Sequence, residues 1–328
     1  MILTTTNRSF IEAEQYSDFI LQNLHDGLLP TNFYRDVSDF GEGEVLNIKT
    51  IGEAQIQEIE EDQAITYSPI ETGNVELRIS EYVGDGWYVT DKFRQDSSQT
   101  DALLAVRGKE ATRAIQEHFE SKALSTLNDG QTAGDANAID GFAHRLAGSG
   151  GATAGEPTLD LEDLIYARLA FNKNEVPMAG RVGIVDPIVE ATFNVVFKIT
   201  SGVGDLAANQ TWQDITENGF ARDHNFIINL YGWNLMTSNR LPAVASEALD
   251  DIDGTSVTVT DGIANLFMCI ADDHVKPLMA AWRQQPRVEG ERNKDKQRDE
   301  YVQTARYGFG LQRLDSLLVI LTSAIKYK

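Results

Sequence analysis

The chain has 328 residues, of which 42% are hydrophobic, so it can bury one large core or two moderate ones. Fifty acidic against 28 basic residues give a net charge of -22, which argues against a sequence-reading nucleic-acid binder. A single cysteine rules out an internal disulfide, and no apolar run is long enough for a membrane span, so we expect a soluble, unexported protein.

The first residues predict a short amphipathic helix. Ser9 is placed to cap it, Glu12 follows as in a capping box, and Gly27 ends the pattern. Phe10 and Phe19 belong to its apolar face. Because this face needs a surface to pack against, we expect the arm to lie on a neighbouring subunit.

A long β-hairpin is predicted next. Residues 45–51 are strand-like, and apolar and polar residues alternate from Val75 to Val83. The tip between the strands carries five acidic residues and no basic one, namely Glu53, Glu58, Glu60, Glu61 and Asp62. A hairpin this acidic is unsuited to a core, so we expect its tip at the surface.

The strongest helix signal runs from residue 98 to 127, with Ser98 and Asp101 as a capping box. Such a helix spans about 45 Å at roughly 1.5 Å per residue. One face carries an apolar stripe of Leu104, Ala111, Ile115, Phe119 and Ala123. The solvated face is expected to carry Lys109, Arg113, Glu117 and Glu120. This pattern predicts a helix that lies along a sheet.

The middle of the chain predicts a second, α+β region. Residues 130–155 are rich in small residues and are expected to form loops or a flexible connector. A helix capped by Asp160 follows, and then a buried strand closed by Pro187. Further strands are expected within residues 224–239 and 255–261.

The last part of the chain predicts two different elements. The mixed charges of residues 287–300 indicate a solvated loop or helix face. The apolar run at residues 314–323 predicts a C-terminal strand that returns to the sheet under the long helix.

One segment has the spacing of a dinucleotide-binding turn. In FKITSGVGDLA, residues 197–207, Gly202, Gly204 and Ala207 match G-x-G-x-x-G/A. That turn should open a helix and lead to a second strand, whereas polar, turn-rich sequence follows here. We interpret the glycines as the end of a strand and expect no cofactor.

Three other patterns point to ordinary structure. The glycine-rich residues 148–151 lack the Lys-Ser/Thr of a phosphate-binding loop. Asp272 to His274 have no second histidine at helical spacing, which favours a surface turn over a metal site. Cys269 has no basic neighbour to activate its thiol. With no metal site and no catalytic group singled out, we expect an assembly protein rather than an enzyme.

Two segments resemble the major capsid proteins of tailed bacteriophages, which have the Hong Kong-97-type fold. NEVPMAGRVGIVDPIV, residues 174–189, resembles the family segment in which a helix leads to Val-Pro, Gly-Arg and a buried strand that ends in Pro. GFARDHNFIINLYGWNLMTSNRLP, residues 219–242, is similar to the later strand that closes on Ser-Asn-x-Leu-Pro. The order of elements also fits over nearly the whole chain. Arg181 and Pro187 would then frame a core strand, and Ser238 and Asn239 would form a turn.

The resemblance implies an α+β, Hong Kong-97-like fold with four parts. These are an N-terminal arm at 1–42, an extended hairpin called the E-loop at 43–86, a peripheral domain with a long spine helix at 87–130 and 305–328, and an axial domain at 131–304. The stretch at residues 245–300 is longer than in the minimal pattern of the family, which indicates an insertion or an elaborated loop. No fused scaffolding extension is expected ahead of residue 1.

The resemblance also implies a function. The chain would form hexamers and pentamers of an icosahedral head shell that encloses double-stranded DNA without reading its sequence. Scaffolding, portal and decoration proteins would be partners, assembly would occur in the host bacterial cytoplasm, and no membrane would be involved. The candidate intersubunit contacts are Glu58, Glu60, Glu61, Asp62, Phe10 and Phe19. We expect the acidic tip to meet basic residues of the next subunit.

Two alternatives stay open at this point. A shell protein of a non-viral nanocompartment would share the fold, and a cargo gene beside this one would favour it over neighbouring portal and terminase genes. A cytoplasmic enzyme that binds a nucleotide at residues 202–207 belongs to another class, and stabilisation by nucleotides would favour it.

Overall fold

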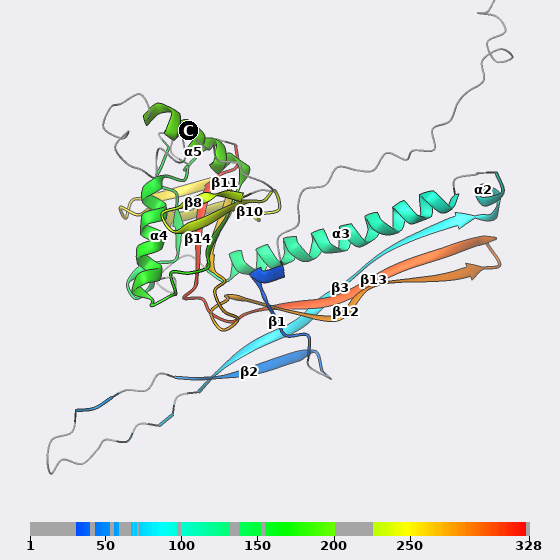
Figure 1. Cartoon of the computed structure of the whole chain (residues 1–328), viewed down its shortest axis with the longest axis horizontal. Helices are drawn as coiled ribbons and strands as arrows, with labels where there is room; N and C mark the ends of the chain where they lie inside the picture. The colour runs from blue at the N-terminus through cyan, green and yellow to red at the C-terminus, as the bar shows by residue number, and fades with distance from the viewer. Residues whose placement is uncertain are drawn as a thin grey trace, which may run out of the picture.

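A computed structural model describes residues 31–39, 43–52, 56–58, 67, 69–70, 72–96, 100–131, 138–151, 155–200 and 226–325. Two β-sheets and the long helix α3, Thr100–Asp129, form its framework (Figure 1). The helix runs along one sheet, and its C-terminal end reaches the lobe that holds the other sheet. The predicted arm at residues 1–30, with Ser9, Phe10 and Phe19, lies outside the described residues.

The elongated sheet has five strands in the order β1-β12-β13-β3-β2. Its strands are β1 Arg35–Asp36, β2 Val45–Ile51, β3 Thr72–Thr90, β12 Leu278–Asn293 and β13 Arg298–Leu311. A one-turn helix η1, Thr31–Phe33, precedes β1, and the short helix α2, Asp91–Asp96, follows β3.

The second sheet has the order β6-β14-β11-β7-β9-β8, and β10 pairs with β11. Its strands are β6 Arg145–Ala147, β7 Arg181–Val185, β8 Phe226–Leu230, β9 Trp233–Thr237, β10 Ala243–Asp250, β11 Ser256–Cys269 and β14 Leu317–Ser323. Helices α4, Leu161–Lys173, and α5, Pro187–Thr200, lie in the same lobe, as does the small hairpin of β4, Ala138–Ile139, and β5, Phe142–Ala143.

The predicted hairpin is confirmed as β2 and β3. The two strands pair antiparallel from Val45 opposite Arg78 to Ile51 opposite Thr72. The alternation read from the sequence places Leu77 and Ile79 against Met279 and Ala281, so this part of β3 is buried on one face. β3 continues well past the expected end of the strand, to Thr90.

The apolar stripe of α3 is confirmed, since Ala111, Ile115, Phe119 and Ala123 are all buried. Phe119 lies at the centre of an aromatic cluster: it stacks on Trp282, with 4.5 Å between the ring centroids, and meets the edges of Tyr307 and Tyr34. Aromatic packing of this kind stabilises a helix on a sheet beyond simple burial. The helix is therefore fixed on β12 and β13 near its middle.

The solvated face expected on α3 is wrong for one residue. Glu120 is only 6% exposed, and Arg240 from the loop after β9 contacts both Glu120 and Glu117. The other lobe covers a second side of the helix. A single apolar stripe in the sequence does not reveal this second contact.

Residues 294–297 form a turn, but the rest of residues 287–300 form strands rather than a loop or a helix face. They form the distal part of the β12–β13 hairpin, and β13 pairs with β3 from Arg298 opposite Thr90 to Phe309 opposite Arg78. This part of β12 has exposed residues on both faces, so it shows no apolar alternation and resembles a loop in composition.

Two further predictions need correction in the second sheet. Within the expected connector at 130–155, β6 is a buried strand that pairs with β14. The C-terminal strand β14 is confirmed as a strand, but it lies between β6 and β11 rather than in the sheet under α3. Only the last turns of α3 reach it, through Leu124 and Leu127.

The segment around Pro187 combines one confirmed and one wrong prediction. The strand β7 is buried throughout and ends before Pro187, as expected. The residues that follow, however, form α5 and not the strand that we expected before Gly202. Proline at the first helical position has no amide to satisfy and a preset φ, which favours this start. Residues 201–225 lie outside the described residues.

The start of α4 holds a buried carboxylate. Asp160 caps the helix as predicted, and Asp163 completes the capping box by accepting the Asp160 amide at 2.8 Å. The same carboxylate accepts the amide of Ser149 at 3.1 Å, so it joins the glycine-rich segment 148–151 to the helix. Burial raises the pKa of Asp163 to about 6.

We predict that Asp163 makes stability depend on pH. Because its folded-state pKa lies above the ordinary value of 3.8, the folded chain binds more protons between about pH 4 and 6. Its contribution to the free energy of unfolding is therefore present at low pH and falls as pH rises through this range. Denaturant unfolding of the wild type and Asp163→Asn should show their difference shifting by about 2 to 3 kcal/mol between pH 4 and 7. A difference independent of pH would contradict this role.

Candidate assembly surfaces

Within the described residues, the patterns that could have carried chemistry are structural. No group of three or more His, Cys, Asp or Glu in this part of the chain could hold a metal, and no helix there is long and apolar enough to cross a membrane. Cys269 is buried, which raises the pKa of its thiol. Asp272 to His274 form an exposed turn.

The family resemblance implies structural roles for four residues, and their positions and contacts fit these roles. The residues are Arg181, Pro187, Ser238 and Asn239. Arg181 is buried and its guanidinium donates to the carbonyls of Val176 and Pro177, so it holds the loop between α4 and β7. Pro187 lies two residues after the end of that strand and begins α5. Ser238 accepts the amide of Arg240 in a turn that includes Asn239.

The first candidate surface is the free end of the β2–β3 hairpin, which extends away from the rest of the chain (Figure 1). Four large apolar side chains are exposed there: Ile51 by 78%, Ile56 by 96%, Tyr67 by 90% and Ile70 by 80%. Their exposure on one projecting element is typical of an interaction site rather than of scattered surface residues.

One of the predicted acidic contacts is described in the same region. Glu58 is described and exposed, beside Ile56. Glu60, Glu61 and Asp62 lie outside the described residues, as do Phe10 and Phe19. The structure thus places one of the six predicted contacts on the projecting hairpin.

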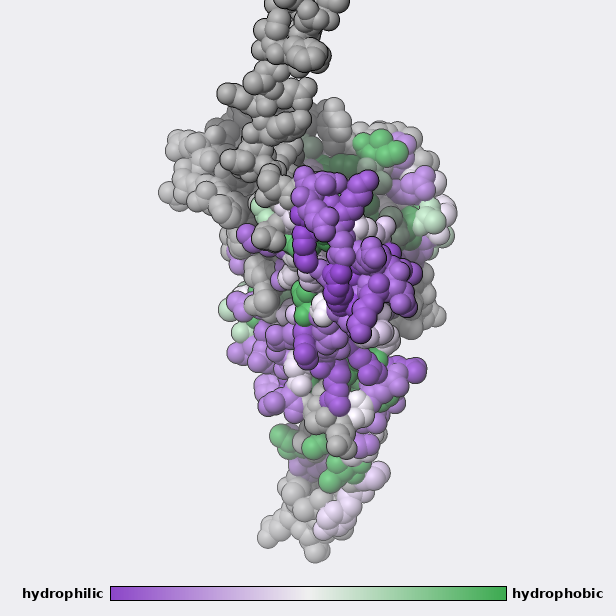
Figure 2. All heavy atoms as spheres, turned by 90° about the vertical axis from the view of Figure 1, so that its right-hand side faces the viewer, coloured by the Kyte–Doolittle hydropathy of each residue, from purple (hydrophilic) through white to green (hydrophobic). Residues whose placement is uncertain are grey.

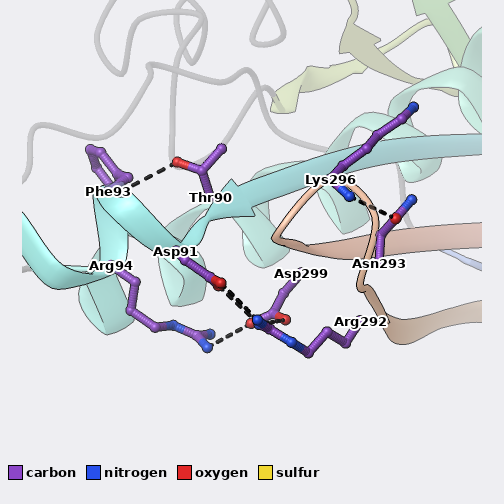
Figure 3. A network of polar contacts seen from close by, with 8 residues as sticks. All are labelled: Thr90, Asp91, Phe93, Arg94, Arg292, Asn293, Lys296 and Asp299. Carbon is purple, nitrogen blue, oxygen red and sulfur yellow. Dashed lines mark hydrogen bonds and ion pairs between the residues drawn. The ribbon is translucent and has the colours of Figure 1, made fainter.

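The second candidate surface is the opposite end of the five-stranded sheet, where α2 meets the β12–β13 turn (Figure 3). Arg292 donates to both carboxylate oxygens of Asp91, at 2.9 and 2.7 Å, and also contacts Asp299 at 3.2 Å. Arg94 contacts the other oxygen of Asp299 at 2.6 Å. These contacts lower the pKa of Asp91 and raise that of Arg292.

This network gives the end of the sheet a fixed shape. Single exposed ion pairs stabilise little, but a bidentate pair within a network fixes the positions of several side chains at once. Seen from this end, the described surface is mainly hydrophilic (Figure 2). The sequence spacing gave no sign of the network, because Asp91 and Arg292 are far apart in the chain.

The third candidate surface is the face of the five-stranded sheet that points away from α3. Tyr82 and Tyr88 stand on β3 with 69% and 58% exposure, and Gly84 and Gly86 lie between them. The guanidinium of Arg298 lies over the Tyr88 ring at 4.3 Å.

The junction between the two lobes is fixed by two arginines. Arg240 contacts Glu117 at 3.0 Å and Glu120 at 3.5 Å on α3. Arg145 forms a bidentate pair with Glu247, at 2.8 and 2.6 Å, and also donates to the carbonyl of Asn128 near the end of α3. A small apolar cavity of about 50 Å³ lies between these contacts, lined by residues of η1, α3 and both sheets. The relative position of the lobes is thus set through α3.

Comparison with known proteins gives one family and a set of similar structures. The model of the family described as phage capsid protein matches residues 74–320. No curated protein sequence matches the chain.

Several solved structures share the fold at low identity. A protein of Mycobacterium phage Che8 is 16% identical, with 94% of this chain and 97% of that chain covered and a TM-score of 0.62. The capsid structure of the cyanophage P-SCSP1u is 13% identical, with 96% and 94% covered and a TM-score of 0.66. The capsid of Ralstonia phage GP4 is 11% identical, with 97% of each chain covered and a TM-score of 0.64.

We predict that Arg240→Ala lowers the free energy of unfolding by about 2 kcal/mol, because it removes the guanidinium that joins Glu117 and Glu120 to the second lobe, while Glu117 keeps its contact with Arg113. Urea unfolding followed by circular dichroism measures the change. Arg287→Ala is the matched control, since the Arg287–Glu289 pair is exposed and should contribute less than about 1 kcal/mol. Equal effects of the two substitutions would show that the Arg240 contact does not hold the lobes together.

Proposed function

The chain belongs to the phage capsid protein family, and we propose that it assembles as hexamers and pentamers into the icosahedral head shell of a tailed bacteriophage. As a major capsid protein it is a structural component of the virion shell. The expected α+β, Hong Kong-97-type fold is confirmed by the similar capsid structures. The observation that carries the assembly proposal is the projecting hairpin, whose exposed apolar side chains need a neighbouring subunit.

The shape of the chain supports interlocking subunits. An isolated two-stranded hairpin is marginally stable in water, so its free end gains stability by lying across another copy. A stable interface between two proteins buries more than about 1,000 Å² of surface. The extended hairpin and the opposite end of the five-stranded sheet provide contact surfaces that are widely spaced on the chain. Contacts between different surfaces of identical chains close into rings, as hexamers and pentamers require.

We also propose how the chain divides into domains. Residues 1–42 form the arm and 43–86 the E-loop. The pairing of β12 and β13 with β3 leads us to assign residues 278–311 to the peripheral domain with α3. The seven-stranded sheet, with β14, forms the axial domain. In this division the axial domain no longer runs continuously to residue 304. Residues 278–300 of the insertion expected near 245–300 become part of the peripheral domain.

The remaining partners follow from a head shell. The net charge of -22 suits a wall that encloses double-stranded DNA without binding it tightly. Scaffolding, portal and decoration proteins are proposed partners, and assembly is proposed to occur in the cytoplasm of the bacterial host. A nanocompartment shell would share the fold, but the family match favours the phage head. The helix α5 before Gly202 weighs against the nucleotide-binding alternative, which needs a strand there.

We predict that the expressed chain, alone or with its neighbouring genes, forms closed shells or rings of capsomers. Size-exclusion chromatography and negative-stain electron microscopy measure this directly. A monodisperse monomer or dimer under both conditions would contradict the proposed function.

We further propose that the acidic tip of the E-loop contacts basic residues of the next subunit. The tip has five acidic residues and no basic one within residues 53–62. Opposite charges at an interface guide the encounter of the partners and exclude wrong ones. We expect Glu60→Lys with Glu61→Lys to reduce shell formation while the monomer stays folded. Asp250→Lys with Asp253→Lys makes the same charge change on β10 and the following turn, and should assemble normally. Normal assembly of the tip variant would refute the contact.

A further inference from the structure

The two edges of the five-stranded sheet differ in chemistry. Beyond its short pairing with β1, β12 forms one edge, which carries Pro286 and a series of charged residues, Arg287, Glu289, Glu291 and Arg292. Proline and charged side chains are features that prevent an edge strand from pairing with another chain. The sheet is thus protected on this side.

The other edge, β2, has none of this protection. Its sequence VLNIKTI contains one charged residue, Lys49, and no proline. Val45 and Ile51 are exposed by 43% and 78%. The strand keeps a single register with β3 over all seven residues, whereas the β12–β13 pairing shifts after Trp282 and Gln284. A regular, largely uncharged edge is a template for another strand.

The backbone pattern shows which groups this edge offers. The amide of Ile79 donates to the carbonyl of Glu44 at 2.9 Å, so these two residues form a hydrogen-bonded pair. Such pairs alternate along an antiparallel ladder, which turns the backbone of Leu46, Ile48 and Thr50 toward β3. The backbone N–H and C=O groups that face the open edge are those of Val45, Asn47, Lys49 and Ile51. They form a row about 20 Å long at roughly 3.4 Å per residue.

We propose that the free edge of β2 pairs with an extended segment of a second copy of this chain, which adds a strand to the five-stranded sheet. This inference rests on the proposed function, because a shell places identical chains side by side at high local concentration. Backbone pairing would supply affinity along the edge, and the alternate side chains would supply specificity.

Two observations favour a second copy as the occupant. The hairpin extends away from the rest of the described chain, so none of the other described segments lies beside the outer edge of β2 (Figure 1). The apolar side chains Ile51, Ile56 and Ile70 are exposed on the same β2–β3 hairpin. A neighbouring subunit that pairs with β2 would also cover these side chains. One contact would then supply hydrogen-bond partners for the free edge and bury the exposed apolar surface.

The test uses a proline that blocks only the outer edge. Asn47→Pro removes an amide that faces away from β3, so it leaves the hydrogen bonds between β2 and β3 in place. The matched control, Asn47→Ala, loses the side-chain contact with Asn74 but keeps the amide. We expect both variants to fold as monomers, and we expect Asn47→Pro to lower the yield of closed shells about tenfold or more relative to Asn47→Ala.

Hydrogen exchange of the wild type gives an independent readout, with amides resolved residue by residue. The amides of residues 46, 48 and 50 should be protected in both free and assembled chains. Those of residues 47, 49 and 51 should exchange quickly in the free chain and about tenfold or more slowly in the shell. This alternation distinguishes strand pairing from general burial of the hairpin.

The outcomes separate this inference from the proposed function. Equal shell yields for the proline and alanine variants, or unchanged exchange at the odd-numbered residues, would overturn the strand pairing while the shell function stands. Protection that appears only when a different protein is present in the particle would overturn the assignment to a second copy. Failure of the wild type to form shells under any condition would contradict the proposed function, and with it this inference.

Discussion

The packing of α3 against both sheets is the constraint on which the rest of the structure depends. Phe119 fixes the helix on β12 and β13 through stacked and edge-on aromatic contacts, while Leu124 and Leu127 enter the core of the second sheet. Arg240 then joins the helix to the second lobe by ion pairs, and Arg145 of the second sheet donates to the carbonyl of Asn128 near the end of the helix. Because one element is buried on two sides, a rigid body results from two sheets that share no strand. The candidate assembly surfaces are therefore connected to one another through α3.

This rigid body explains why the chain can expose so much at its ends. The β2–β3 hairpin leaves the core with one face unburied, and the opposite end of the sheet has hydrophilic side chains held by Asp91, Arg292 and Asp299. A monomer gains little from either element, since exposed ion pairs stabilise weakly and a lone hairpin is marginal. Both become useful when identical copies surround the chain. The residues that join the lobes of the monomer differ from those of the proposed shell contacts, so each set can be altered separately.

The sequence predicted those elements whose signal is local. The alternation in β3, the stripe of α3, the capping of α4 by Asp160 and the buried strand β7 all follow from spacing alone. The sequence did not predict the elements and contacts that depend on residues far apart in the chain. β6 is too short to show a period and depends on pairing with β14, and residues 287–300 resemble a loop because both faces are solvated. The pairs Arg240–Glu117 and Arg292–Asp91 leave no trace in spacing, because the two residues of each pair are more than one hundred residues apart. All six expected intersubunit contacts stay predictions, and of these residues Glu58 is described, on the exposed part of the β2–β3 hairpin.

Electron cryomicroscopy of shells formed by this chain tests most directly whether a rigid subunit interlocks with its copies through the projecting hairpin. The result we expect is a shell in which α3 and both sheets keep the arrangement described above, while the hairpin lies on an adjacent subunit and its exposed isoleucines are covered. A shell in which the hairpin folds back onto its own chain, or in which the lobes meet at a different angle around α3, would contradict this view of the molecule.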